Sequence, residues 1–182
     1  MTPRPFVPLG VTWRPLRLPG LELYQNMAIE ARISAELDGW LGTPYAAGCA
    51  AKGIGGGVDC IRFVCAAMDA LYGFRREPID RLPHDVALHN PTAANAALRK
   101  IIRMYEPCVH VEDGSLEPGD VVIVSLGGGG PSHAKIADTR RNTLYHATAD
   151  GICMTGILEQ EGTPWAVYRV QDKHRWLKKE AA

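Results

Sequence analysis

One cysteine and two histidines are the residues of this sequence best suited to nucleophilic chemistry. Cys60 follows a glycine-rich segment, residues 52–58, and precedes apolar residues that recur at helical spacing. Asp59 is therefore expected to cap a helix that begins at Cys60, where unpaired backbone N–H groups and the helix dipole favour a thiolate. His133 and His146 lie in strand-like surroundings. A cysteine at a helix start, with a histidine and a third polar group on neighbouring strands, is the layout of a thiol hydrolase.

Each of these residue types also has a plainer interpretation. Free cysteine is often buried as a small hydrophobic side chain, which is how we interpret Cys65, Cys108 and Cys153. Cys60 differs from them by its glycine lead and its cap position. A histidine can be an ordinary surface residue, and we give that interpretation to the histidines in loop or tail contexts without a recognisable partner: His84, His89, His110 and His174.

The elements that must position these residues change character halfway along the chain. Apolar spacing predicts a helix over 24–41, ended by Gly42-Thr43-Pro44, a second from Cys60 to Gly73, and a third over 92–104. The second half consists of short apolar runs, with Asp150-Gly151 as a hairpin signal. These runs predict strands at 121–124, 132–138, 143–148, 151–156 and 165–170. Helices followed by a meander predict an α+β domain in which N-terminal helices pack on an antiparallel sheet.

The composition is that of a globular chain without a dominant charge. The 182 residues suit one domain, and the 20 basic and 20 acidic residues cancel. No global field therefore recruits nucleic acid or an anionic membrane, and we expect neither as a partner. The five cysteines are an odd number without a C-x-x-C pair, which argues against a disulfide framework and a structural zinc site.

The two ends of the chain differ from the part between them. Residues 1–22 contain several prolines and arginines and predict an extended arm, which could serve for docking. Residues 23–171 form the expected domain, and residues 172–182 a basic tail. The N-terminal residues have neither the pattern of a signal peptide nor that of a membrane span, so we expect a protein made in the cytoplasm.

Five motifs in order give the chain a resemblance to a known family. They are Gly42-Thr43-Pro44-Tyr45, Gly57-Val58-Asp59-Cys60, Leu116-Glu117-Pro118-Gly119-Asp120, Ser132-His133 and Tyr145-His146-Ala147. Together these motifs resemble those of NlpC-type cell-wall cysteine peptidases, across roughly residues 27–156. That family has a compact papain-like fold and cleaves peptide bonds in bacterial peptidoglycan stems. The form without a signal peptide is similar to peptidases associated with phage tails, which implies a virion location and particle proteins as partners of residues 1–22.

The resemblance implies a role for each residue of the trio. Cys60 is the expected nucleophile, His133 the general base, and His146 the group that fixes the tautomer of His133. Tyr45 matches a family tyrosine whose hydroxyl faces the active site, and with the backbone N–H of Cys60 it could form an oxyanion hole. The plainer alternative for Tyr45 is a core aromatic side chain. No cofactor and no metal is implied.

Asp59 and Arg62 are the expected substrate-binding residues. The family aspartate caps the helix and binds the ammonium terminus of a stem peptide, although a carboxylate beside Cys60 would also raise the pKa of the thiol. The family pattern continues with serine and glycine, whereas Ile61 and Arg62 stand here. We expect Arg62 to pair with a nearby acid or with a substrate carboxylate.

Three alternatives remain open at this point. The departures at Ile61 and Arg62 suit a structural or binding component that keeps the fold without catalysis. The same trio would also serve a thiol acyltransferase or an amidase acting on a substrate outside the cell wall. A zinc hydrolase using Cys60, His133 and His146 has acceptable ligand types. The glycine tracts at 53–57 and 127–130 match no phosphate-binding motif and are interpreted as loops.

Overall fold

A computed structural model describes residues 21–74, 107–125, 133–157 and 163–177, together with residues 93, 96, 99, 100, 102 and 103. Residues 1–20 of the predicted arm lie outside the described residues. Residues 21 and 22, which were predicted to belong to the arm, are helical. The basic tail is described as far as residue 177, and the loop at 127–130 is not among the described residues.

Helix α1 (Leu21–Asp38) begins and ends about three residues before the predicted range of 24–41. Ile29, Ile33 and Leu37 recur every fourth residue and are buried, which gives the helix its core-facing stripe. The chain then turns before Gly42, whose φ of 76° is the left-handed conformation that glycine adopts without strain.

Helix α2 (Cys60–Tyr72) agrees with the prediction at both ends. The side chain of Asp59 accepts hydrogen bonds from the backbone N–H groups of Ile61 and Arg62, so it is the expected N-cap. Gly73 ends the helix in the left-handed conformation, with φ of 74°. In the predicted third helix, the described positions 93, 96, 99, 100, 102 and 103 are all helical.

The main sheet contains six antiparallel strands in the order β3-β8-β4-β5-β6-β7. Four consecutive strands form the predicted meander: β4 (Val121–Ser125), β5 (His133–Asp138), β6 (Thr143–Thr148) and β7 (Gly151–Gly156). The last strand, β8 (Thr163–Val170), returns across the sheet and pairs with β4 and with β3 (Cys108–His110). The expected α+β class with an antiparallel sheet is confirmed, while this return and β3 were not predicted.

A small hairpin that sequence patterns did not indicate leads into α2. It consists of β1 (Ala50–Ala51) and β2 (Gly57–Val58), which pair antiparallel. Gly56 makes this hairpin possible, because a Cβ at that position would lie 2.0 Å from the carbonyl oxygen of Ala51. The glycine-rich lead before Cys60 is therefore a tightly folded hairpin.

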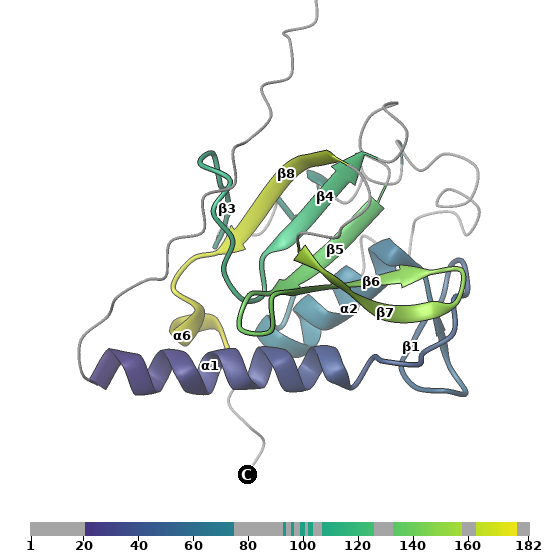
Figure 1. Cartoon of the computed structure of the whole chain (residues 1–182), viewed down its shortest axis with the longest axis horizontal. Coiled ribbons are helices and arrows are strands. Elements are labelled where there is room, and N and C mark those ends of the chain that lie inside the picture. Colours follow the sequence, from purple (N-terminus) through teal and green to yellow (C-terminus); the bar gives the residue numbers. More distant parts are fainter. Residues whose placement is uncertain are drawn as a thin grey trace, which may run out of the picture.

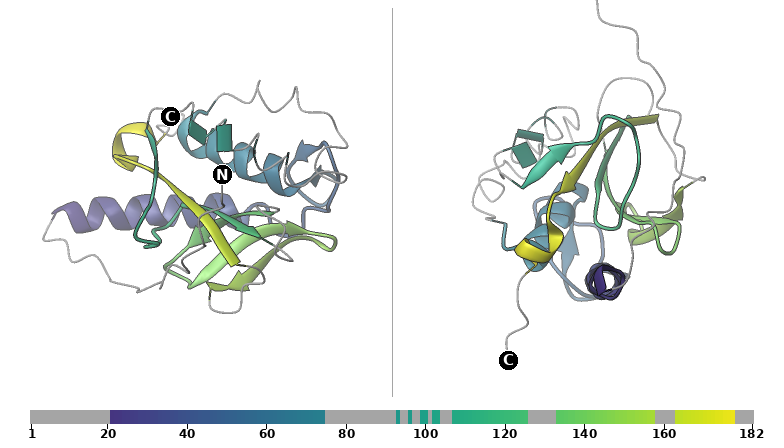
Figure 2. Two further views of the ribbon diagram at one scale, coloured as in Figure 1. Left: turned by 90° about the horizontal axis from the view of Figure 1, so that it is seen from above. Right: turned by 90° about the vertical axis from the view of Figure 1, so that its left-hand side faces the viewer.

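Both long helices cover the same face of the sheet (Figures 1 and 2). The larger core cluster joins Ile33 of α1 and Phe63 of α2 to sheet residues such as Ile136. A smaller cluster lies on the opposite face; its members are Val122, Val124, Ala137, Leu144 and Ile157. Because strand side chains alternate between faces, neighbouring residues of β4 and β5 belong to different clusters.

The first part of the basic tail is attached to the domain. Helix α6 (Lys173–Trp176) follows β8, and the ammonium group of Lys173 donates to the carboxylate of Glu117 at 3.1 Å and to the carbonyl of Pro118 at 2.7 Å. This short helix contacts α1, so the start of the tail is part of the packed structure.

Candidate active site

The sulfur of Cys60 lies among backbone N–H groups at the start of α2. The backbone groups of Cys60, Ile61 and Ala134 hydrogen-bond it and lower its pKa, which is the effect of donors on a thiolate. Two of these donors come from the first turn of the helix, as the cap position predicted. The third comes from β5, directly after His133.

The contact between the sulfur of Cys60 and the backbone of Ala134 depends on where the pairing between β5 and β6 ends. The N–H of Ala137 points toward the β4 side, where it donates to the carbonyl of Asp120. Directions alternate along a strand, so the N–H of Ala134 points toward the β6 side. There, the pairing of β5 with β6 begins only at Ile136, opposite Tyr145, whereas its pairing with β4 continues to His133. The N–H of Ala134, which precedes the paired residues of β5 on this side, therefore reaches the sulfur of Cys60.

The two predicted histidines meet each other across β5 and β6. Nε2 of His133 lies 2.9 Å from Nδ1 of His146, and the rings stand at 75° to one another. The register of the strands makes them diagonal neighbours on one face, because the pairing of Ile136 with Tyr145 places His146 opposite Lys135. The structure thus brings the imidazoles together, and leaves Nδ1 of His133 as the nitrogen that does not face His146.

Lys135 is a member of this group that the sequence analysis did not single out. Its side chain is only 1% exposed, and alternation puts it on the same face as His133. Its positive charge lowers the pKa of both histidines. The available signal was a lysine two residues after His133 within a predicted strand, a spacing that directs both side chains to one face.

Asp59 connects Cys60 to the loop before it. Its carboxylate accepts the N–H of Gly48 at 2.9 Å in addition to the two capping bonds. It also accepts Nη1 of Arg62 at 2.6 Å, in an ion pair whose side chains are 0% and 5% exposed. Arg62 therefore pairs with a nearby acid, which is one of the two expectations for it. The substrate-binding role of Asp59 and Arg62 stays a prediction.

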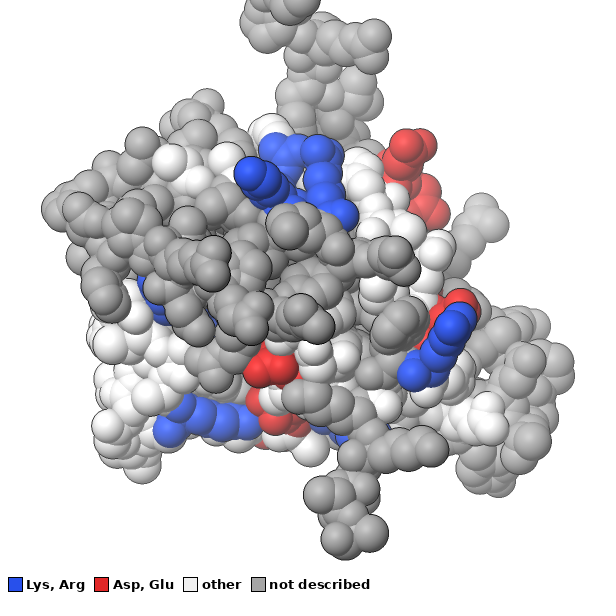
Figure 3. Space-filling view, turned by 180° about the vertical axis from the view of Figure 1, so that it is seen from behind, with Lys and Arg blue, Asp and Glu red and all other residues white. Residues whose placement is uncertain are grey.

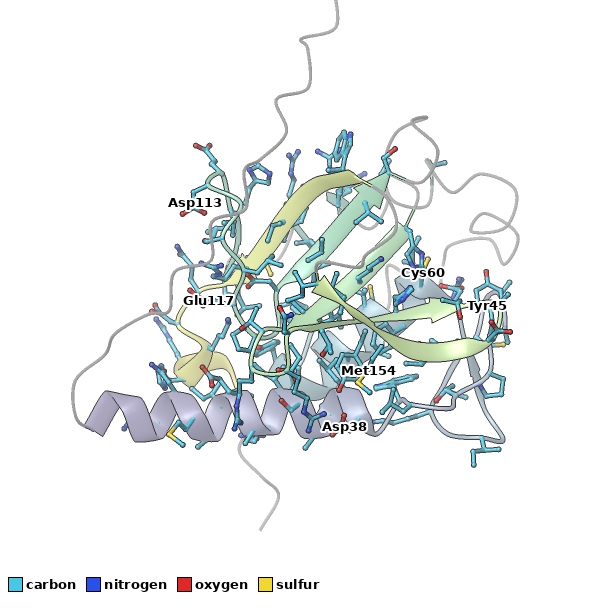
Figure 4. The ribbon with its side chains drawn as sticks, viewed as in Figure 1. Asp38, Tyr45, Cys60, Asp113, Glu117 and Met154 are labelled. Carbon is cyan, nitrogen blue, oxygen red and sulfur yellow. The ribbon has the colours of Figure 1, made fainter. Side chains whose placement is uncertain are left out.

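Tyr45 lies beside Cys60, at the opposite end of the fold from Asp113 and Glu117 (Figure 4). It is half-buried, and a bridge to Val58 fixes its backbone next to β2. Burial raises the pKa of its hydroxyl, and the neighbouring Cys60 and Asp59 raise this pKa further. The predicted neighbour of the nucleophile is therefore close to the thiol, and its phenol is held in the protonated, hydrogen-bond-donating form.

The site is held in uncharged protonation states around neutral pH. Burial, followed by the negative charge of Asp59, raises the pKa of Cys60 to about 11. Burial, followed by the charges of His146 and Lys135, lowers the pKa of His133 to about 3. Burial and then Lys135 lower the pKa of His146 to about 4. The prediction that the helix terminus would favour a resting thiolate is corrected, because burial and Asp59 outweigh the backbone donors.

The remaining cysteines and histidines are not drawn into the site. Cys65 and Cys108 form no disulfide and are half-buried, consistent with the plainer interpretation. His110 and His174 are exposed, whereas His84 and His89, and the side chain of Cys153, lie outside the described residues. Within the described part of the chain, no group of three His, Cys, Asp or Glu side chains is arranged to hold a metal ion.

A polar pocket of about 410 Å³ lies far from this chemistry, at the end of the sheet marked by Glu117 in Figure 4. Its lining includes Arg169 and Lys173, whose charges are paired with Glu117 and Asp120. The residues that line it include no cysteine or serine that could act as a nucleophile.

The face of the molecule in Figure 3 carries basic and acidic side chains in several small groups. Among the helices described, none is both long and apolar enough to span a bilayer.

Comparison of the chain with known proteins gives no further assignment. Neither the models of known protein families nor the curated proteins contain a match to this sequence.

Proposed function

We propose that this protein is a cysteine peptidase or amidase that hydrolyses an amide bond in peptidoglycan stem peptides through an acyl-enzyme on Cys60. We also propose that its α+β domain has the papain-like arrangement of NlpC-type enzymes. The main support is one juxtaposition: a thiol on a helix N-terminus, hydrogen-bonded to the strand residue that follows a histidine whose ring is held by a second histidine. The peptidoglycan substrate is supported by the resemblance of the five motifs.

The hydrogen bond between the imidazoles defines the tautomers that the reaction needs. For Nδ1 of His133 to accept a proton, Nε2 of His133 must carry hydrogen and donate to Nδ1 of His146. His146 then carries its own proton on Nε2. In this arrangement His146 orients the base without needing a charge, which suits an imidazole kept neutral by burial.

The reaction then starts from a neutral thiol and a neutral imidazole. As the sulfur of Cys60 attacks the carbonyl carbon, its proton passes to Nδ1 of His133, and the carbonyl oxygen gains a negative charge. The hydroxyl of Tyr45 and the N–H of Cys60 are the donors proposed for that oxygen. Collapse of the intermediate breaks the C–N bond while His133 gives its proton to the leaving amine. Water, deprotonated by His133, then hydrolyses the thioester.

The test uses purified peptidoglycan and mass spectrometry of the fragments released. Wild type should release soluble peptides, and Cys60→Ala should release none above background. Cys65→Ala is the matched control, since Cys65 is another half-buried cysteine on the same helix, five residues further on. Equal release by wild type and Cys60→Ala, or no release by either, would contradict the proposal.

A structural or binding component is the second candidate, and the raised pKa of Cys60 favours it. In that case Cys60 should react with a thiol-directed electrophile no faster than an ordinary free thiol, and no fragments should appear. The acyltransferase alternative predicts that an added amine appears in the product where hydrolysis would leave a carboxylate.

A further inference from the structure

The carboxylate nearest to the nucleophile has its hydrogen-bonding capacity occupied from within the protein. Oδ1 of Asp59 accepts the backbone N–H groups of Ile61 at 3.1 Å and Arg62 at 2.8 Å. Oδ2 accepts the N–H of Gly48 at 2.9 Å and the guanidinium of Arg62 at 2.6 Å. Two bonds to each oxygen approach the number that a carboxylate can accept. The side chain is also 0% exposed, so a substrate group cannot reach it in this arrangement.

Arg62 also cancels the charge of this carboxylate. An acid one residue from the nucleophile would otherwise attract a cationic group of a bound peptide close to the scissile bond. Lys135, whose charge acts on the two imidazoles, is positive, and the imidazoles themselves are neutral. The described residues around Cys60 therefore provide no net negative charge to balance an ammonium group.

We propose that the site selects peptides without a free ammonium group near the scissile bond, that is, N-acylated or internal peptide segments. An ammonium group brought there would lose hydration without gaining a partner. An amide at the same position has no charge to desolvate. This inference rests on the proposed function, since it concerns the substrate of the same site.

The test compares two fluorogenic peptides that differ only at the α-amino group next to the scissile segment, which is free in one and acetylated in the other. Wild type should have a kcat/KM about tenfold higher for the acetylated peptide, as expected for an uncompensated charge. The preference should fade as pH rises past about 8, where the α-amino group loses its proton. A tenfold preference of wild type for the free amine would overturn the inference.

Two variants test whether the ion pair of Asp59 with Arg62 causes this preference. Arg62→Gln removes the guanidinium and leaves Asp59 charged. The ratio of kcat/KM for the acetylated peptide to that for the free amine should therefore fall at least tenfold. The double variant Asp59→Asn/Arg62→Gln removes both charges and keeps a capping side chain, so it should retain the wild-type preference even if Arg62→Gln does not fold. An unchanged ratio in folded Arg62→Gln, or a reversed ratio in the double variant, would contradict the inference.

The outcome for the proposed function is separate. If neither peptide is cleaved and no acyl adduct forms on Cys60, the hydrolase proposal fails and the substrate inference fails with it. If both peptides are cleaved and the free amine is preferred, the hydrolase stands and only the substrate inference is wrong.

Discussion

The two ends of the sheet bury ionisable groups in different ways. At the end near β8 and α6, Asp120 is fully buried and accepts Nη2 of Arg169 at 2.7 Å, while Lys173 contacts Glu117 at 3.1 Å. Every one of these groups faces an opposite charge. At the end near Cys60, the thiol and the imidazole of His133 are half-buried and the imidazole of His146 is buried, all in neutral forms, and the only buried ion pair described there is that of Asp59 with Arg62.

The two ends therefore illustrate two roles of ionisable groups in a fold: paired charges stabilise the structure, and neutral acids and bases can take part in proton transfer. A paired buried charge stays charged and holds its partners in place, and removing one partner leaves an uncompensated charge. A buried neutral acid or base has an altered proton affinity and can exchange a proton when a substrate changes its surroundings. We therefore expect substitutions at the Arg169 end to affect stability, and substitutions at the Cys60 end to affect reactivity.

The largest effect is expected at His133. His133→Ala removes the proposed base and should lower kcat/KM about 10²–10⁴-fold with little change in the melting temperature. His146→Ala removes only the orienting partner and should have a smaller effect than His133→Ala. Steady-state kinetics and thermal unfolding of both variants test this. A larger loss for His146→Ala would reverse the roles assigned to the two imidazoles.

At the other end, Arg169→Met should destabilise the fold by about 3–5 kcal/mol, because it leaves the buried carboxylate of Asp120 without its guanidinium partner. The reactivity of Cys60 should not change in the folded variant. Denaturant unfolding gives the free energy of unfolding, and thiol alkylation below the transition gives the reactivity. Arg140→Met is a suitable control, because its ion pair with Glu30 is much more exposed and spans 3.7 Å.

The neutral imidazoles should make the protein sensitive to mild acid. Their pKa values are lower in the folded state than the usual 6.5, so the unfolded state binds more protons and stability falls as pH drops below about 6.5 toward 4 and 3. For His146 alone the loss at pH 5 is about 1–2 kcal/mol. The double variant His133→Asn/His146→Asn should show a flatter dependence of unfolding free energy on pH. An equally steep curve in that variant would assign the acid sensitivity to other groups.

The smallest effect concerns Lys135. Lys135→Met keeps the length of the side chain and removes its charge, so the pKa of His146 should rise. Histidine NMR titration measures this directly. Lys52→Met, at a site paired with Glu36, is the matched control and should leave the imidazole titration unchanged. A pKa of His146 that is unaffected by Lys135→Met would mean that burial alone keeps the imidazole neutral.

The sequence was most informative where structure is local. The Asp59 cap, the Gly73 end of α2 and the meander from Val121 to Gly156 all depend on short-range patterns, and all are found in the structure. The return of β8 to the side of β4 depends on a pairing between distant segments, which periodicity does not encode. The same holds for the candidate site. Motif context was enough to propose Cys60, His133 and His146, whereas the burial of Lys135 depends on packing between distant segments and could not be predicted.

One electrostatic expectation failed for a definable reason. The helix start predicted a lowered pKa for Cys60, and the donors that cause such a lowering are present. Their effect is exceeded by burial and by Asp59, and the degree of burial depends on how β5 covers the helix terminus. The pairing of Arg62 with Asp59, three residues apart, was within reach of the sequence, since this spacing brings helical side chains together.

The most direct test of the account is the pH dependence of Cys60 alkylation, followed by peptide mapping so that the other cysteines are counted separately. A neutral Cys60 thiol and a neutral His133 predict a rate that rises continuously with pH toward the thiol pKa of about 11, with no plateau between pH 4 and pH 8. A plateau of rapid alkylation within that interval would show a resting thiolate–imidazolium pair, and would contradict the neutral site described here.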